Sequence, residues 1–275
     1  MAPAPVKSDI IGQKVRTEIL RPQDSEKDRV LGCRHELKYL VSEAQTVAIS
    51  QFLAPHLAVD RYSKLQPQGY YPIVSLYLDS LDLRLARETL EREKNRFKLR
   101  IRSYSDDLEY PVFVEIKRRI NRIILKSRTR IRHQDIPAVI SGRALVHQDA
   151  RMDLKTLNQF QLYTQTLRAN PVMLVRYLRK AYEGGTESRI RVTFDRDLSY
   201  KKTNTTDITL GGSGWQRNTL SQHGTILEIK FTGTYPHWLS EMTACFGLQA
   251  RGVSKYASSI QQSTASGFCV PRVGA

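Results

Sequence analysis

Apolar and polar residues alternate along several short segments of the chain, and a two-residue period of this kind predicts β-strands. In residues 97–104, for example, Phe97, Leu99 and Ile101 alternate with basic residues. The same alternation predicts seven further strands, at residues 34–41, 73–78, 112–119, 123–132, 171–182, 189–195 and 225–231. Eight short strands separated by turns favour an antiparallel sheet.

Segments between the strands have apolar residues three or four positions apart, which predicts amphipathic helices. Ser42-Glu43-Ala44-Gln45 fits a capping box, and Ile49, Leu53 and Leu57 recur on one side of the helix that follows. Asp79 precedes another helical pattern and is expected to cap it. Further helices are predicted at residues 81–94, 134–147, 153–167 and 236–246. The chain therefore combines one sheet with four or five helices, an α+β pattern.

The charge of the predicted strands lies chiefly on one face of each strand, and it is mostly positive. Counted over these faces, 13 cations accompany four carboxylates. The cations are Arg34, Lys38, Lys98, Arg100, Arg102, Lys117, Lys126, Arg128, Arg130, Arg132, Arg189, Arg191 and Lys230, and the carboxylates are Glu36, Glu115, Asp195 and Glu228. A face so rich in cations repels itself unless water or a bound anion compensates it.

These charged faces have two interpretations, a solvated outer surface or the lining of an interior. Mixed charges paired across strands are common on solvated sheets, where each pair contributes roughly 0.2–1 kcal/mol. The helices favour the second interpretation, because their apolar stripes need an apolar sheet face to cover. If the helices pack outside a closed sheet, the charged faces point inward. We therefore predict a closed eight-stranded antiparallel β-barrel with a basic interior and amphipathic helices outside.

Composition supports a globular protein with an anionic partner. The 275 residues are 40% hydrophobic, which is enough to fill a sizeable core. The formal net charge is +16, which favours a polyphosphate, a nucleotide, a nucleic acid or an acidic membrane surface as partner. We expect a flexible leader at 1–30, one domain at 31–262 and a flexible tail at 263–275.

Several classes of protein are not supported by the sequence. Cys33, Cys245 and Cys269 have no metal-type spacing, and their odd number favours a reducing, cytoplasmic location. No signal-peptide pattern and no membrane-spanning run of apolar residues occurs. The glycine cluster 211–214 is followed by Trp215 rather than by Lys-Ser/Thr, and no HxxxH pair occurs, so Walker-type and zinc sites are not indicated.

A basic interior with a few carboxylates suits chained phosphates. Guanidinium groups bind phosphate oxygens in bidentate fashion. Carboxylates among phosphates are repelled unless a divalent cation bridges them, which predicts Mg²⁺ or Mn²⁺ as cofactor. The chemistry that such a site supports is phosphoryl transfer, which depends on positioning and charge neutralisation.

Nine short motifs, in order along residues 34–258, resemble the polyphosphate polymerase domain of the vacuolar transporter chaperone proteins, a branch of the triphosphate tunnel metalloenzymes. Stand-alone copies of this domain resemble bacterial members. The motifs are RHELKYLV (34–41), SLYLDS (75–80), NRFKLRIRSY (95–104), VFVEIKRR (112–119), LKSR (125–128), YLRKAY (177–182), RVTFD (191–195), ILEIKF (226–231) and SKY (254–256).

The resemblance implies that ATP donates its γ-phosphate to a growing polyphosphate chain inside a tunnel, with a divalent metal, often manganese, and release of ADP. The basic side chains that the resemblance implies in catalysis are Lys38, Arg100, Arg102, Lys117, Lys126, Arg179, Arg191 and Lys255. The phosphate or nucleotide ligands are Arg34 and Arg128 by resemblance, with Lys98, Arg189, Lys230 and Ser254 added from the strand pattern and the SKY motif. Glu228 is the implied metal ligand, and Glu36 and Glu115 join it as isolated carboxylates.

Two points stay open at this level. The motif selects Arg179, although alternation pairs it with Val175 and Tyr177 rather than with a charged face. Glu115 either binds metal or positions Lys117. Tyr39 and Tyr77 are expected in the core.

Two other functions compete with the polymerase. A metal-dependent hydrolase of inorganic triphosphate or short polyphosphate would use the same interior, with activated water as acceptor. A non-catalytic binder of polyphosphate or nucleic acid would need only the charge. No RNP-like run of aromatic and basic residues occurs, so no specific nucleic acid is expected as partner.

Overall fold

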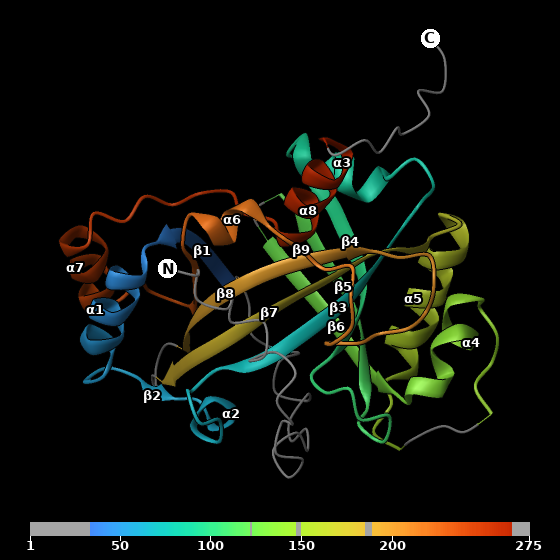
Figure 1. The fold of residues 1–275 in the computed structure, drawn as a ribbon, viewed down its shortest axis with the longest axis horizontal. Coiled ribbons are helices and arrows are strands. Elements are labelled where there is room, and N and C mark those ends of the chain that lie inside the picture. Colours follow the sequence, from blue (N-terminus) through green and yellow to red (C-terminus); the bar gives the residue numbers. More distant parts are fainter. Residues whose placement is uncertain (1–33, 122, 147–149, 185–188, 266–275) are drawn as a thin grey trace, which may run out of the picture.

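Eight strands follow one antiparallel path through a single sheet (Figure 1). The computed structural model describes residues 34–121, 123–146, 150–184 and 189–265. The path runs through β1 (Arg34–Val41), β10 (Thr225–Thr232), β8 (Ile190–Lys202), β7 (Asn170–Gly184), β3 (Tyr71–Asp79), β4 (Asn95–Ser103), β5 (Val112–Ile120) and β6 (Ile123–Ile131). Two short strands join it at the side, β2 (Ala58–Val59) on β7 and β9 (Gln216–Arg217) on β8.

All eight predicted strands are present, and β7 and β8 are longer than predicted. Their ladder continues to the pair Met173 and Lys202, past a register shift between Arg176 and Leu178. Across this shift β8 has one residue more than β7. The side chains of β8 beyond the bulge therefore point to the other face, and the two-residue period of that strand breaks there. The predicted loop at 203–224 also contains β9 and a short helix.

The two ends of the strand path approach each other without a shared ladder. Within the described residues, β1 pairs only with β10 and β6 only with β5. The Nζ atom of Lys117 on β5 reaches Glu36 on β1 at 2.9 Å and so bridges the two ends. The α+β class and the antiparallel path are confirmed, and side chains rather than backbone bonds connect the ends.

Helices connect the strands and cover the sheet. They are α1 (Glu43–Leu53), α2 (Arg61–Lys64), α3 (Arg84–Leu90), a 3-10 helix (His133–Asp135), α4 (Ile136–Ile140), α5 (Leu154–Thr166), α6 (Thr219–Gln222), α7 (His237–Cys245) and α8 (Lys255–Ala265). The capping box at the start of α1 is confirmed, because Ser42 and Gln45 bond each other's backbone. The predicted helices 81–94 and 134–147 are shorter than expected. A left-handed Leu83 with φ of 55° delays the start of α3.

Two apolar clusters lie between the sheet and its covering helices. Ile49 of α1 and Met242 of α7 are fully buried against the outer faces of β1, β8 and β10. On the other half of the sheet, Phe160 of α5 packs with Leu99 and Val114. Figure 1 shows these helices at opposite sides of the sheet. The outer faces are therefore apolar, and the charged faces point inward.

Helix α8 is the exception, because it packs against inner-face residues at one end of the sheet. Its Tyr256 and Ile260 share an apolar cluster with Tyr77, Val175 and Tyr177. The helix also passes the predicted domain end at residue 262 and continues to Ala265, with Ser263 buried. The predicted leader at 1–30 and residues 266–275 of the predicted tail lie outside the described residues.

We predict that Gly224→Ala destabilises the fold. A Cβ atom at Gly224 would lie 2.1 Å from the carbonyl oxygen of Val41, and its φ of +138° disfavours any L side chain. The free energy of unfolding, measured by urea denaturation, should fall by about 2–4 kcal/mol. Gly211→Ala is the control, since its nearest atom would be an ordinary 3.8 Å away. Equal stability of the two variants would contradict this account.

Candidate phosphate-binding site

The inner face of the sheet brings together charged side chains from facing strands. The cations that point inward are Lys38, Lys98, Arg100, Arg102, Lys117, Lys126, Arg128, Arg179, Arg191, Lys230 and Lys255. Within the described residues, the carboxylates on the same inner face are Glu36, Glu115, Asp195 and Glu228, with Asp60 at one end. Cations thus exceed carboxylates about twofold in this interior.

Glu115 is the centre of the first cluster. Its carboxylate is fully buried and lies 2.6 Å from Arg100, 3.0 Å from Lys126, 3.4 Å from Arg128 and 4.0 Å from Arg102. Burial acts to raise the pKa of Glu115, but these four cations together hold it well below its usual range. Glu115 therefore stays ionised and holds four cations in place.

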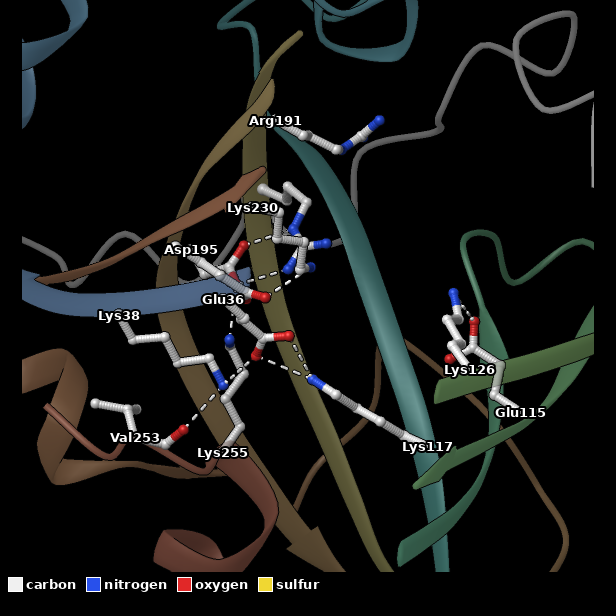
Figure 2. Close-up of polar contacts among 12 residues, drawn as sticks. Glu36, Lys38, Glu115, Lys117, Lys126, Arg191, Asp195, Lys230, Val253 and Lys255 are labelled. Carbon is white, nitrogen blue, oxygen red and sulfur yellow. Dashed lines mark hydrogen bonds and ion pairs between the residues drawn. The ribbon is translucent and has the colours of Figure 1, made fainter. Parts of the chain in front are cut away.

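Glu36 and Glu228 form the second cluster with three lysines. The Glu36 carboxylate lies 2.9 Å from both Lys38 and Lys117, and Lys230 lies 2.6 Å from Glu228. Figure 2 shows Lys38 and Lys117 pointing at Glu36 from opposite sides. Burial and the neighbouring Glu228 act to raise the pKa of Glu36, yet the lysines lower it to about 2.

Two interior lysines have pKa values near neutrality. Burial lowers the pKa of Lys117 to about 7, with help from Lys38, although Glu36 opposes the change. Burial likewise lowers the pKa of Lys126 to about 8 despite its contact with Glu115. Burial and the nearby Lys38 and Lys117 also lower the pKa of Lys98 well below its usual range. The interior lacks negative charge to match its lysines, so an added anion would raise these pKa values.

Asp195 organises the third cluster. Its buried carboxylate accepts two hydrogen bonds from Arg179, at 2.6 and 2.8 Å, and lies 2.7 Å from Lys255. The motif-based choice of Arg179 agrees with this position. Arg176 lies outside, where its guanidinium stacks on Trp215 at 4.2 Å from the ring centroid.

A short C-terminal segment closes one end of the interior. Lys38 donates to the carbonyl oxygen of Val253 at 3.1 Å, and Lys98 donates to the Ser254 hydroxyl at 2.7 Å. Lys255 follows and reaches Asp195 (Figure 2). At the other end, Arg191 pairs with the buried Asp60 at 2.8 Å.

Sequence reasoning missed four inner-face tyrosines that accept hydrogen bonds from arginines. Tyr77 is buried in an apolar cluster, as predicted, and its hydroxyl also accepts from Arg100 at 3.2 Å. The other pairs are Tyr177 with Arg102 at 3.3 Å, Tyr104 with Arg128 at 3.2 Å and Tyr71 with Arg191 at 3.4 Å. Strand alternation could have found Tyr104, which continues the series of Lys98, Arg100 and Arg102. Burial acts to raise the pKa of Tyr104, but the nearby Arg128 and Arg102 lower it to about 7.

The remaining predicted ligands lie elsewhere. Arg189 is exposed just before β8 and does not join the interior clusters. Arg34 begins β1, but its side chain lies outside the described residues.

A divalent cation fits beside Glu228 better than beside Glu115. Thr193 lies directly opposite Glu228 in the β8–β10 ladder, and its buried hydroxyl has no hydrogen-bond partner among the residues that the structure describes. Glu36 and Glu228 are both nearly buried. In the described part of the chain no group of three or more His, Cys, Asp or Glu side chains could hold a metal, so phosphate oxygens and water would complete the coordination. Four cations surround Glu115 and four surround Glu228, so the Thr193 hydroxyl is what favours Glu228, and the metal role of Glu115 stays a prediction.

Comparison with known proteins identifies one family. The sequence profile of the VTC domain matches residues 33–264. No curated protein matches the chain by sequence.

Solved structures show weaker likenesses. A Hippeastrum adenylyl cyclase candidate with a dominant triphosphatase activity shares 16% identity at a TM-score of 0.49, over 82% of this chain and 95% of that chain. A Bacillus halodurans adenylate cyclase candidate shares 12% identity at a TM-score of 0.43, over 80% of this chain and 95% of that chain. A Pyrococcus horikoshii OT3 protein shares 11% identity at a TM-score of 0.43, over 83% of this chain and 99% of that chain. At these identities and TM-scores no activity transfers to this chain.

Among the residues that the structure describes, no helix combines the length and the apolar character that crossing a bilayer requires.

We predict that Glu115→Gln destabilises the protein and that phosphate restores it. The substitution leaves four cations without their shared carboxylate, of which Arg100 and Arg102 are largely buried, and this should lower the free energy of unfolding by about 3–5 kcal/mol. Inorganic tripolyphosphate should then raise Tm more in the variant than in the wild type, because it supplies the missing negative charge.

Glu183→Gln is the matched control for this experiment. The Glu183 side chain is half exposed and pairs with Arg191, so its loss should cost under about 1 kcal/mol. Equal Tm shifts with tripolyphosphate in the wild type and in Glu115→Gln would contradict the role given to Glu115.

Proposed function

The chain belongs to the VTC domain family, and we propose that it synthesises inorganic polyphosphate by transferring the γ-phosphate of ATP to a growing chain. The observation that carries the proposal is the interior itself, where cations from facing strands exceed the carboxylates about twofold. A chain of phosphates is an anion long enough to contact these clusters together.

The chemistry proposed here needs no protein nucleophile. The terminal oxygen of the chain forms a bond to the γ-phosphorus of ATP, and the bond between that phosphorus and the ADP oxygen breaks. Preorganised cations stabilise the charge that develops on the transferred group. Arg100, Arg102 and Lys126 are already ordered by Glu115, and Lys38 and Lys117 by Glu36. They therefore need little reorganisation when phosphate binds.

The other proposed phosphate ligands extend this set along the interior. They are Arg128, Arg179, Arg191, Lys98, Lys230, Ser254 and Lys255, with tyrosine hydroxyls beside them. A divalent cation, Mn²⁺ or Mg²⁺, would be held by Glu228 with Thr193 and Glu36 nearby, and would neutralise phosphate charge when bound. ATP and polyphosphate are the proposed partners, and the cytoplasmic location expected from the cysteines stays a prediction.

One observation favours a second candidate function, a metal-dependent hydrolase of inorganic triphosphate. Lys117 has a pKa lowered to about 7, so at pH 7–8 a fraction of this lysine is neutral and able to accept a proton from water. Water would then take the place of the chain end as acceptor. Product analysis distinguishes the two reactions, because a hydrolase releases orthophosphate and builds no polymer.

We predict that the protein converts ATP and Mn²⁺ into ADP and an acid-stable polymer. Lys38→Ala should lower the rate by at least about a hundredfold, because it removes a preorganised cation beside Glu36. Polymer is measured by gel electrophoresis and ADP by chromatography. Lys64→Ala, on the short helix α2 and exposed, serves as the control. Orthophosphate without polymer would replace this proposal with the hydrolase, and wild-type activity in Lys38→Ala would refute both.

We also predict that tripolyphosphate binding weakens as pH rises from 7 to 9. Lysines are charged below their pKa, so raising the pH through about 7 and about 8 removes the charges of Lys117 and Lys126. Affinity should fall by about tenfold for each pKa unit by which the bound anion raises these lysines. Calorimetry at pH 8 in buffers of different ionisation enthalpy should show proton uptake on binding.

Lys117→Arg tests the assignment, because arginine stays charged over this whole range. The variant should bind with a shallower pH dependence and take up fewer protons than the wild type. An unchanged pH profile would assign the titration to another group.

A further inference from the structure

We propose that Asp79 and Tyr256 are positioning residues that hold the segment 253–255 over the end of the interior. The segment supplies Ser254 and Lys255, so this inference deepens the proposed function and rests on it for the identity of the ligand. Neither Asp79 nor Tyr256 reaches into the interior clusters. Both act through the residues that they hold.

Asp79 is a fully buried carboxylate at the end of β3. It accepts hydrogen bonds from the backbone N–H groups of Ser80 at 2.8 Å, Leu85 at 2.9 Å and Ala86 at 3.0 Å. It thereby joins the strand end rigidly to the first turn of α3, as the sequence predicted for a cap. A further hydrogen bond, from the Tyr256 hydroxyl at 2.7 Å, connects this rigid point to α8.

Tyr256 is buried and fixed at two points. Its hydroxyl is bound to Asp79, and its ring stacks on Tyr77 with a centroid distance of 4.5 Å and an interplanar angle of 7°. Tyr77 in turn accepts from Arg100, which pairs with Glu115. The anchor of α8 is therefore continuous with the first cation cluster of the site.

Ser254 and Lys255 immediately precede Tyr256, so the position of Tyr256 determines where their side chains point. Lys255 reaches Asp195 at 2.7 Å and lies over the ring of Tyr177, 4.8 Å from its centroid. Ser254 accepts from Lys98 and also from the backbone N–H of Ala257 in the first turn of α8. The contacts of the segment with the interior are thus polar, and a bound phosphate chain can exchange them for its own oxygens.

The rest of α8 is held by other contacts. Its further attachments are hydroxyl and amide bonds such as Asn218 to Ser259 at 3.0 Å, together with the buried Ile260. Loss of the Tyr256 hydroxyl would leave Asp79 buried with one donor fewer, which costs more than an exposed hydrogen bond. We therefore expect the first turn of α8 to open more often in Tyr256→Phe, while the ring still fills its place.

Hydrogen exchange on the full chain tests the anchor directly. The amides of Ala257 and Ser258 bond to Ser254, so their exchange reports opening of the first turn of α8. In Tyr256→Phe it should speed up by about fivefold to thirtyfold relative to the wild type. Saturating inorganic tripolyphosphate should slow this exchange in the wild type and in Tyr256→Phe, because tripolyphosphate binds the protein with the segment 253–255 in place. Tripolyphosphate affinity, measured by calorimetry, should fall by about fivefold, since binding must now order Ser254 and Lys255.

Tyr39→Phe is the matched control. Tyr39 is also buried and hydrogen-bonded, to Tyr235, but it lies in the apolar cluster beneath α1 and α7. It should leave exchange at Ala257 and Ser258 and tripolyphosphate affinity unchanged. Asp79→Asn is a second variant and should act in the same direction as Tyr256→Phe. If Asp79→Asn does not fold, Tyr256→Phe alone decides.

Two results would overturn the proposal. Unchanged exchange in Tyr256→Phe would show that the hydroxyl does not hold the segment. Faster exchange with unchanged affinity for tripolyphosphate would show that the segment is structural and positions no ligand. The outcome is independent of polymer synthesis: a wild type that makes no polymer, but whose variants behave as expected, would refute the proposed function and support the positioning role.

Discussion

The structure depends on burying an excess of positive charge inside a sheet. Isolated buried ammonium and guanidinium groups are costly, and each inner-face cluster offsets that cost with a shared carboxylate. Glu115 serves four cations, Glu36 two lysines and Asp195 an arginine with a lysine. The carboxylates are too few to neutralise the interior, and burial together with this shortage of negative charge lowers the pKa values of Lys98, Lys117 and Lys126. The same deficit supports the proposal that an anion binds there.

This constraint also explains the arrangement of the layers. A sheet with one charged face has only its other face for packing, so α1, α5 and α7 cover the outside. The ends of the strand path have no common ladder in the described residues, and Lys117 and Glu36 connect them through the interior. Helix α8 packs on the inner side because its first turn brings polar groups, Ser254 and Lys255, together with the aromatic ring of Tyr256. Fold and site are therefore built from the same contacts.

Much of this could be predicted where the two-residue period holds. In β4 and β5, alternation alone places Lys98, Arg100, Arg102, Glu115 and Lys117 on one inner face. It fails in β8, where the three steps from Arg196 to Ser199 face only two steps in β7, so the face changes past the bulge. In β7 alternation correctly groups Arg179 with Val175 and Tyr177, but these apolar neighbours gave no sign that their face is the inner one, and only the motif selected Arg179. The tyrosines were missed because a buried tyrosine has the same pattern as core, and the hydrogen bond that distinguishes Tyr77 comes from another strand. Tyr256, which binds Asp79, and Lys117, which binds Glu36, are distant from them in sequence, so no local pattern contains these two pairs.

The inner-face tyrosines are further polar groups that a long anion in this interior would contact. More lysines would bind phosphate more strongly, but each would add repulsion and lose its proton, as Lys117 already tends to do. A tyrosine hydroxyl adds a hydrogen-bonding group without adding positive charge, and by accepting from an arginine it also fixes the plane of the guanidinium group. Arg100, Arg102, Arg128 and Arg191 are each held in this way. The interior thus gains hydrogen-bonding groups without gaining positive charge, which limits the repulsion between neighbouring cations.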